Sequence, residues 1–442
     1  MNKAKASVIS ESPDVAGLLG LKPTGEIRWG LRRTRTMLHA VGRPHMAFCS
    51  VHIGGTNGKG SVAAMLASIL TGAGHRVGLY TSPHLVDFRE RIRVSGRLVE
   101  EELLAAAARR LRPVAEEVEA TFFETSTALA FLCFAEMGAE IVVAEVGLGG
   151  RLDSTNVLLP EVATITNVAW DHSDYLGHTL AAIAGEKAGI AKPGIPLVLG
   201  RLDPEAGRIV RQTANRVGAP LVQLGYDAGV RRIRISREHT ELEYVGLDRA
   251  APIPLRCPLL GAHQAWNAGV AALTAQTLPE RWRPGPDEIA AGIADTRWPG
   301  RLQVAQRCGR TWVLDAAHNP EGVEALTQGL TSLDLEPPLA VVVAIMGDKP
   351  WPEMLPPLLA VADVSIFTVA PSSPPERRWD AEAVAATVAS YPVEVIVDFE
   401  AALERAMQVA TTVVITGSNH TVGDAMKYLE IPVGLLSPGG AG

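Results

Sequence analysis

The chain has 442 residues, a formal net charge of -7 and a charged fraction of 20%. This length exceeds what one hydrophobic core normally serves, so we expect two or three domains in a mildly acidic protein. The sequence has no basic run suited to a nucleic-acid backbone and no long uncharged apolar run. These features exclude nucleic acid and a membrane from the expected partners.

The N-terminal residues up to Asp14 lack the apolar core of a signal peptide, which favours a cytoplasmic location. The 4 cysteines stand far apart, without the paired spacing of a zinc site or a disulfide framework. We therefore expect buried thiols in a reducing compartment. We expect residues 1–24 to form an N-terminal extension that could be flexible. We also expect the protein to be a monomer.

The segment from Val51 to Ser61 combines a β-branched strand, a glycine-rich loop and the start of a helix. Glycines let consecutive backbone N–H groups point at one anion, Lys59 can reach the outer phosphates, and Ser61 can ligate Mg²⁺. The first glycines lie closer to the lysine than usual, and the alternative is a tight turn before an Ala-rich helix. The strand, lysine and hydroxyl together favour a nucleoside triphosphate. The expected phosphate loop consists of Gly55, Thr56, Asn57, Gly58, Lys59, Gly60 and Ser61.

Apolar runs over 48–53, 76–81, 140–146 and 162–168 alternate with helical patterns. This alternation predicts βαβ units and a mostly parallel sheet, with ligands beyond the carboxyl ends of the strands. Glu145 ends one run and precedes a glycine-rich segment, so it resembles a metal-holding Walker B acid, although it could be a solvated edge residue. Ser82 follows another run and could add a hydroxyl to the metal or only form a Ser-Pro turn.

Two further residues of the N-terminal half carry competing interpretations. His172 follows the strand that ends near Val168, where a neutral imidazole could coordinate a metal or serve as a structural hydrogen-bonding group. Lys187 lies on a helix predicted to start near Thr179, and most helical lysines are solvated at the surface.

Alternation over 231–236 and 242–244 predicts a small antiparallel pair of strands. Segment 297–301 follows a helical pattern and precedes a new strand, so we place the domain boundary there, between residues 25–297 and 298–442. Strands are predicted within the second domain, which we expect to be a smaller doubly wound unit. Their ranges are 312–315, 339–345, 364–369, 393–397 and 412–416.

Within that second domain, Asp315 and His318 stand between a strand and a helix that begins at Pro320. Asn319 could be only the cap of this helix. Asp315 and His318 could equally bind a ribose or a phosphate supplied by the other domain.

These motifs together resemble the folylpolyglutamate synthase and dihydrofolate synthase family. The matching segments, in family order, are 55–61, 81–85, 146–153, 171–172, 186–190 and 315–319. Segments 261–267 and 299–301 also look like family motifs, so the resemblance spans roughly residues 25 to 425. It implies the α/β architecture of the Mur ligase superfamily. That architecture has an N-terminal P-loop ATPase domain with a mostly parallel sheet, a C-terminal Rossmann-like domain, and catalysis in the cleft between them.

The resemblance also implies roles for single residues. Ser61, Ser82 and Glu145 would hold one Mg²⁺ ion, while Glu145, His172 and Lys187 would hold a second. Lys187 would be carbamylated, so that it carries a carboxylate head. Lys59 would stabilise charge on the transferring phosphoryl group. The residues implied to contact the nucleotide are Asn267, Arg301, Asp315 and His318, and those implied to hold the pterin substrate are Phe123 and Asp153.

The implied activity is ATP-dependent ligation of L-glutamate to dihydropteroate, to reduced folates, or to both, through an acyl phosphate. Two departures from the family pattern stand out. Ala316 occupies a position that is usually Gly, a small change that keeps the turn. Asn419 and His420 replace an apolar and aromatic pair, which leaves substrate preference open.

Three other functions compete with this one. A Mur-type ligase acting on a different carboxylic acid is the nearest alternative. A GTPase is disfavoured because the sequence lacks the Asn-Lys-x-Asp motif that selects guanine. A nucleotide-binding scaffold without turnover is disfavoured because the implied metal ligands are all present.

Overall fold

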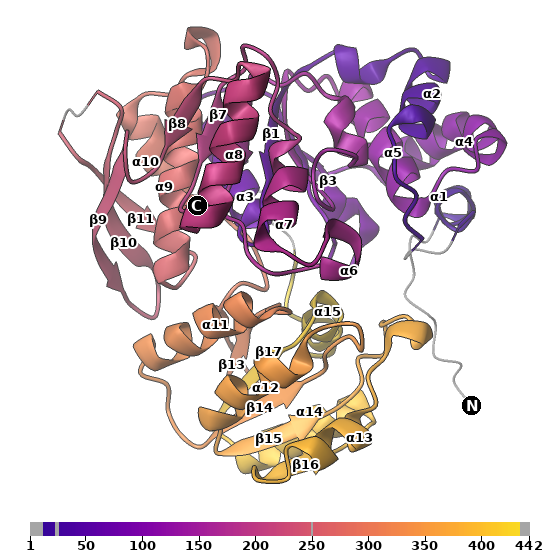
Figure 1. Cartoon of the computed structure of the whole chain (residues 1–442). Coiled ribbons are helices and arrows are strands. Elements are labelled where there is room, and N and C mark those ends of the chain that lie inside the picture. The colour runs from indigo at the N-terminus through magenta and orange to yellow at the C-terminus, as the bar shows by residue number, and fades with distance from the viewer. Residues whose placement is uncertain (1–11, 23–25, 249–250, 434–442) are drawn as a thin grey trace, which may run out of the picture.

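The computed structural model describes residues 12–22, 26–248 and 251–433. Figure 1 shows two main domains, of which the C-terminal one, in orange and yellow, lies below the larger N-terminal one. Part of the expected N-terminal extension is a helix, α1 (Pro13–Leu19), whose Val15 and Leu18 are buried. The remainder of that extension, residues 1–11 and 23–24, lies outside the described residues.

An eight-stranded sheet in the order β4-β3-β2-β5-β1-β6-β7-β8 organises the N-terminal domain. Its pairs are parallel from β2 to β8, whereas β3 is antiparallel to both β2 and β4. The strands are β1 (Cys49–Gly54), β2 (Val77–Tyr80), β3 (Ile92–Val94), β4 (Arg97–Leu98), β5 (Ile141–Glu145), β6 (Val162–Ile165), β7 (Leu197–Leu199) and β8 (Leu221–Gln223). Because β1, β2, β5 and β6 are almost wholly buried, they lack polar alternation, as expected for strands covered on both faces.

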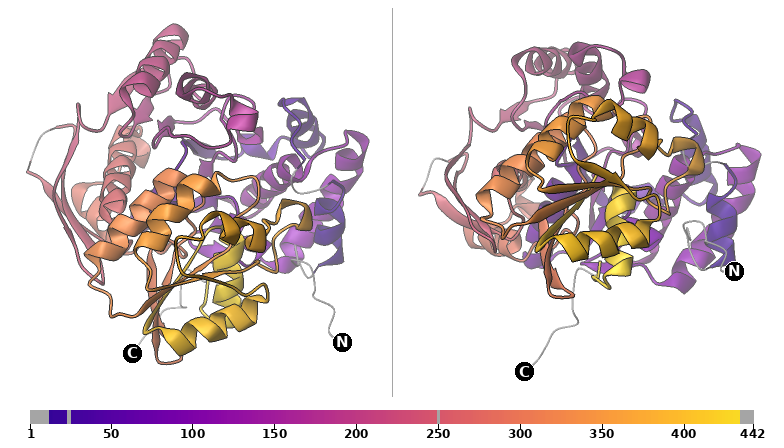
Figure 2. Two further views of the ribbon diagram at one scale, coloured as in Figure 1. Left: turned by 60° about the horizontal axis from the view of Figure 1, so that its bottom comes forward. Right: turned by 90° about the horizontal axis from the view of Figure 1, so that it is seen from below.

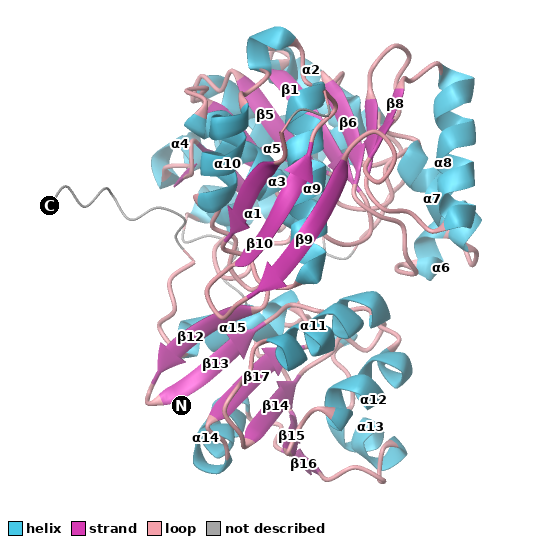
Figure 3. Ribbon diagram, turned by 90° about the vertical axis from the view of Figure 1, so that its left-hand side faces the viewer, coloured by secondary structure: helices cyan, strands magenta, loops and turns pink. Residues whose placement is uncertain are grey.

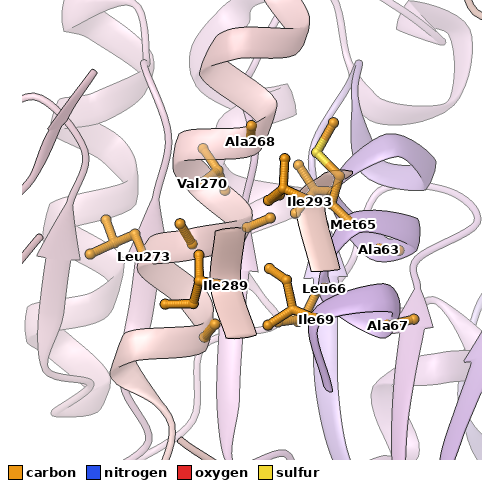
Figure 4. Close-up of a cluster of buried hydrophobic side chains, with 14 of the residues drawn as sticks. Ala63, Met65, Leu66, Ala67, Ile69, Ala268, Val270, Leu273, Ile289 and Ile293 are labelled. Carbon is orange, nitrogen blue, oxygen red and sulfur yellow. The ribbon is translucent and has the colours of Figure 1, made fainter. Parts of the chain in front are cut away.

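Helices cover both faces of this sheet. Figure 4 shows one face, where α3 (Lys59–Gly72), α9 (Ala262–Thr277) and α10 (Pro286–Ala294) bring Leu66, Ile69 and Ile289 together in one apolar cluster. The second face carries α4 and α5. Helices α7 and α8 pack on each other and share an apolar cluster with β6 and β7. The remaining helices of this domain are α2 (Arg32–Ala40), α4 (Glu101–Glu117), α5 (Phe122–Glu136), α6 (Ser173–Leu176), α7 (Leu180–Ala188) and α8 (Pro204–Val217), and its 3-10 turns are η1 (Pro44–Met46), η2 (Phe88–Arg91), η3 (Ser154–Val157) and η4 (Glu280–Trp282).

The predicted antiparallel pair is in fact a three-stranded sheet, β9 (Gly229–Ile235), β10 (Thr240–Val245) and β11 (Ile253–Cys257). Figure 3 shows it as a separate ribbon beside the main sheet. The prediction missed β11, in which buried Ile253, Leu255 and Cys257 alternate with exposed Pro254 and Arg256. Pro254 obscured the pattern because proline is uncommon within strands and is tolerated mainly at an edge.

The C-terminal domain has a six-stranded sheet in the order β12-β13-β17-β14-β15-β16, parallel except for the β12–β13 pair. Figure 2 shows this sheet between two groups of helices. The strands are β12 (Gln303–Arg307), β13 (Arg310–Leu314), β14 (Leu339–Val343), β15 (Val364–Phe367), β16 (Val393–Val395) and β17 (Thr412–Thr416). The helices are α11 (Pro320–Ser332), α12 (Trp351–Ala360), α13 (Ala381–Thr387), α14 (Phe399–Val409) and α15 (Asn419–Tyr428), with the turn η5 (Pro375–Arg377).

The expectation of four buried thiols is only partly met. Cys133 and Cys257 are buried, Cys49 is half-buried and Cys308 is exposed. Cys308 lies in the turn between β12 and β13 with a φ of 51°, where the chain reverses at the surface. None of the described helices combines the length and the apolar character that a bilayer crossing requires.

Candidate functional site

The expected phosphate loop joins β1 to α3 at the carboxyl end of the main sheet. Gly58 has a φ of 77°, and a Cβ there would lie 2.5 Å from Asn267 Oδ1, so only glycine fits between the loop and α9. The loop is held by the segment that follows β6, because Thr56 N–H and Asn57 N–H both donate to the Asn167 side-chain oxygen. The free N–H groups at the start of α3 therefore face the cavity in one preset arrangement.

Lys59 occupies the first turn of α3 and is half-buried. Its ammonium donates one hydrogen bond, 2.8 Å long, to the backbone oxygen of Thr56. An ammonium has three N–H groups, so two remain for an anion in the loop. Ser61, two residues further along in the same turn, is buried and lines the same cavity.

Glu145 ends β5 next to this loop and is only 4% exposed. Burial raises the pKa of its carboxyl group, although the nearby Lys59 ammonium and the Ser82 N–H oppose the shift. The Ser82 N–H donates to Glu145 Oε2 at 3.1 Å, which brings the Ser82 loop to the carboxylate. The solvated-edge alternative for Glu145 is therefore wrong.

The donors at this point suit Mg²⁺. Glu145 offers a carboxylate, and Ser61 and Ser82 offer hydroxyls, all three in the lining of one cavity. Across the described ranges, no three His, Cys, Asp or Glu side chains gather closely enough to hold a metal by themselves. Mg²⁺ commonly binds through one or two carboxylates plus substrate phosphates and water, so a single buried Glu beside a phosphate loop fits it.

Lys187 lies on α7 and is 4% exposed, so the surface-lysine alternative is wrong. Its ammonium donates to the backbone oxygen of Gly55 at 2.9 Å, directly beneath the phosphate loop. Burial, assisted by the positive charge of Lys59, lowers the pKa of Lys187 to about 7. An amine with this pKa is partly neutral at physiological pH and can act as a nucleophile.

An ion pair joins the two domains beside this site. Lys349, from the loop after β14, donates to Asp171 Oδ1 at 2.8 Å, and the two side chains are 7% and 8% exposed. Burial alone would raise the pKa of Asp171, but Lys349 and the neighbouring histidines hold it well below its usual range. His172 and His318 lie 3.8 and 3.9 Å from Asp171 Oδ2. Burial lowers their pKa values to about 3 and about 4, so both imidazoles are neutral at pH 7.

Asn319 links the same region to the phosphate loop. It is the cap of α11, as its side-chain oxygen accepts a hydrogen bond from Gly322 N–H at 2.8 Å. Its amide also donates to Asn57 Oδ1 at 2.9 Å and to Asp171 Oδ2 at 3.3 Å. One residue therefore starts a helix of the C-terminal domain and contacts the loop of the N-terminal domain.

Asp315, Arg301 and Asn267 complete the site. Asp315 follows β13 and accepts hydrogen bonds from Leu302 N–H and Ala317 N–H at 2.7 and 2.9 Å. Burial raises its pKa to about 6, although Arg301 opposes the shift. Arg301 donates to the backbone oxygen of Gly300, and Asn267 donates to the Gln264 side chain.

A cavity of about 530 Å³ between the domains unites these groups. The predicted site residues in its lining are Gly55, Thr56, Asn57, Gly58, Lys59, Gly60, Ser61, Ser82, Glu145, His172, Lys187, Asn267, Arg301, Asp315 and His318. Two predicted residues lie outside that lining. Phe123, on α5, lies against the Gly147 backbone, where a Cβ would come within 2.2 Å of the ring. Asp153 is buried and accepts hydrogen bonds from Leu148 N–H at 2.8 Å and Thr155 N–H at 3.0 Å.

The sequence did not single out several residues that the structure places here. Lys349 follows the carboxyl end of a parallel strand, a position at which ligands gather, but a lysine in such a loop has no distinctive spacing. Glu321 receives hydrogen bonds from Asn57 and from Asn167 at 2.5 and 3.1 Å, across the domain boundary. Arg201 and Trp266 also line the cavity.

Replacing Lys349 by Met should destabilise the protein, because Asp171 would lose its ion-pair partner while remaining largely buried. Breaking one side of a buried pair costs about 3 to 5 kcal/mol. Chemical unfolding followed by circular dichroism tests this, with Arg377→Met as the control. Arg377 pairs with Asp348, the residue before Lys349, but that pair is exposed, so its loss should cost less than about 1 kcal/mol. Equal effects of the two changes would contradict a buried link between the domains.

Comparison with known proteins agrees with this geometry. Residues 53–275 match the model of the Mur ligase middle domain, and residues 300–419 match that of the Mur ligase glutamate ligase domain. The Bacillus subtilis dihydrofolate synthase/folylpolyglutamate synthase is 34% identical over 423 residues, which cover 93% of this chain and 96% of that protein. The Escherichia coli dihydrofolate synthase/folylpolyglutamate synthase is 33% identical over 407 residues and covers 91% of both chains.

Among solved structures, the Mycobacterium tuberculosis folylpolyglutamate synthase complexed with ADP superimposes with a TM-score of 0.87 at 33% identity. That match covers 95% of this chain and 99% of the other. The match with Escherichia coli FolC in complex with DHPP and ADP has a TM-score of 0.83 at 28% identity and covers 97% of this chain and 99% of the other. Sequence, fold and site agree, and the chain belongs to the dihydrofolate synthase/folylpolyglutamate synthase family of Mur ligases.

Proposed function

We propose that this protein is an ATP-dependent ligase that adds L-glutamate to dihydropteroate, to reduced folates, or to both. The observation that carries the proposal is the interdomain cavity. It combines a phosphate loop, a buried carboxylate at a strand end and polar groups from the opposite domain. Relatives that share the fold over most of the chain are named dihydrofolate synthase/folylpolyglutamate synthase.

The order of the chemical steps follows from the low reactivity of a carboxylate toward an amine. A carboxylate reacts poorly with an amine, so its oxygen first attacks the γ-phosphorus of ATP, which releases ADP and forms an acyl phosphate. The glutamate amine then attacks the acyl carbon, loses a proton and expels phosphate, leaving an amide. The cleft between the domains can exclude water that would otherwise hydrolyse the mixed anhydride.

Individual residues of this chain have distinct roles in these reaction steps. The Gly55–Gly58 backbone and Lys59 bind and orient the triphosphate, and Lys59 stabilises charge on the transferring phosphoryl group. Arg301, Asp315 and His318 contact the nucleotide from the C-terminal domain, and Asn267 contacts it from α9 beside the phosphate loop.

Magnesium fits the oxygen donors of Ser61, Ser82 and Glu145, and when bound it would neutralise phosphate charge. For a second ion, His172 offers a neutral imidazole and Glu145 a shared carboxylate. Lys187 can contribute only as its carbamate, because an ammonium repels a cation. Its lowered pKa supports that modification, since only the neutral amine adds to carbon dioxide.

The acceptor side of the site is assigned to Phe123 and Asp153. The Phe123 ring packs against the glycine-rich loop that follows β5. Asp153 already accepts hydrogen bonds from the backbone of Leu148 and Thr155, so it supports the pterin pocket by fixing that loop. We place the domain limits at residues 25–297 and 298–442, and we expect a cytoplasmic monomer.

The deciding experiment is ADP release by the purified protein with Mg²⁺-ATP and L-glutamate. Dihydropteroate, tetrahydrofolate and no acceptor are compared, and the products are checked by mass spectrometry. We expect acceptor-dependent ADP release with one new glutamyl amide per ADP. Reaction with dihydropteroate alone identifies a dihydrofolate synthase, and reaction with both acceptors identifies a bifunctional enzyme. Reaction with neither contradicts the proposal and favours a Mur-type ligase for another acid.

A further inference from the structure

The interdomain cavity is lined by more residues than the chemistry above uses. The proposed metal ligands lie beside the phosphate loop, where Ser82 N–H donates to Glu145 and Lys187 donates to the Gly55 oxygen. The lining also includes Arg201 and Trp266, to which no step of the reaction assigns a role. These two residues come from the loop after β7 and from the second turn of α9.

Arg201 and Trp266 form a stacked pair. The Arg201 guanidinium carbon lies 4.4 Å from the centre of the Trp266 ring. Trp266 is half-buried and packs on the apolar core of its domain, so its position is fixed. Arg201 is exposed, and no acidic side chain in the described part of the chain forms an ion pair with it. The ring thus holds a guanidinium whose outer face is open.

The phosphate loop contacts α9 at Asn267, the residue that follows Trp266. Asn267 lies against Gly58, since a Cβ on that glycine would come within 2.5 Å of the Asn267 oxygen. Trp266 precedes Asn267 in the sequence and lines the same cavity. A nucleotide whose phosphates occupy the loop therefore has the stacked pair within reach of its other end.

Small residues of the other domain line the same cavity. Gly322 and Ala325, from the first two turns of α11, contribute to its lining together with Arg201 and Trp266. A glycine and an alanine leave room that a larger side chain would fill. A cavity with a planar cation on one domain and small residues on the other suits a flat heteroaromatic ring.

We propose that Arg201, held in place by Trp266, stacks on the base of the bound nucleotide. Arginine is suited to this because its guanidinium is planar, permanently charged and weakly hydrated, and it stacks on aromatic faces and nucleobases. This inference deepens the proposed function, on which it rests for the identity of the nucleotide. It makes Arg201 a base-contacting residue and Trp266 a positioning residue.

The test compares MgADP with inorganic tripolyphosphate, which has phosphates but no base. Arg201→Gln should weaken MgADP binding about tenfold, within the range that base stacking contributes. It should leave tripolyphosphate binding, measured by competition, within about twofold. The matched control is Arg208→Gln, an exposed arginine on α8 that hydrogen-bonds Gln212 and lies outside the cavity lining. This control should change neither ligand.

Trp266→Phe keeps an aromatic ring under the guanidinium and should retain most of the MgADP affinity, whereas Trp266→Leu should resemble Arg201→Gln. Equal weakening of MgADP and tripolyphosphate by Arg201→Gln would assign Arg201 to the phosphates and overturn the proposal. Unchanged binding of both ligands would also overturn it. Because these measurements need no acceptor, they stand even if the ADP-release assay finds no activity with dihydropteroate or tetrahydrofolate.

Discussion

Lys59→Ala is expected to lower ATP-dependent amide formation by at least about a hundredfold. Removing one preorganised group that stabilises transition-state charge costs that much in other enzymes. The Lys59 ammonium already lies at the loop, 2.8 Å from the Thr56 oxygen, so nothing has to move for it to meet a phosphate. No other residue on the first turn of α3 carries a charge.

The measurement is the initial rate of ADP release in the presence of acceptor and glutamate, with the folded state checked by circular dichroism. Lys59 is half-buried and its ammonium makes a single hydrogen bond among the described residues, so the variant should unfold at nearly the same temperature as the parent protein. Lys192→Ala is the control, since Lys192 bonds Asn156 and lies outside the cavity lining. Retained activity in a folded Lys59→Ala protein would refute the phosphate-loop assignment.

The sequence predicted the parts of this molecule that depend on neighbouring residues. The phosphate loop is one such part, because a strand, glycines, a lysine and a serine follow one another within eleven positions, 51–61. Glu145 is another, because a buried strand that ends in an acid points to the carboxyl edge of a parallel sheet. In both cases the chemistry lies where the local pattern indicated, inside one cavity.

Two contacts between distant parts of the chain were not predicted. Lys349 and Asp171 are 178 residues apart, and no local pattern records their contact. The same holds for Arg201 and Trp266, whose stacking results from the packing of two separate elements. Strands β3 and β4 were missed for another reason, since with 3 and 2 residues they are too short to show a period.

Lys187 is an exception to the general rule that lysines on helices are exposed to solvent. Most helical lysines are exposed, yet α7 directs this one under the phosphate loop, where its amine donates to the Gly55 oxygen. The surrounding glycines and alanines of α7 give no sequence sign of that burial. The resemblance of segment 186–190 to the family motif singled out Lys187 as a metal ligand, whereas its burial is visible only in the three-dimensional arrangement.

Lys187→Ala is expected to abolish ligation and to regain part of it with added formate or acetate. If the amine adds to carbon dioxide, it loses a proton and gains a carboxylate head that can ligate a cation. Truncation leaves a space in the cavity that Glu145 and His172 also line, and a short carboxylate can occupy it. The rate should rise with acid concentration and saturate. Lys192→Ala, four residues after the end of α7, should need no added acid.

A second measurement separates a modified lysine from an inaccessible site. Protein equilibrated with carbon-13 bicarbonate should show one carbamate carbon resonance that is absent from Lys187→Ala and present in Lys192→Ala. The signal should strengthen as pH rises through about 7, because deprotonation of the buried amine supplies the reactive form. Absence of both the resonance and the rescue would leave Lys187 as a structural hydrogen-bond donor to Gly55, and the second cation would then lack its third protein ligand.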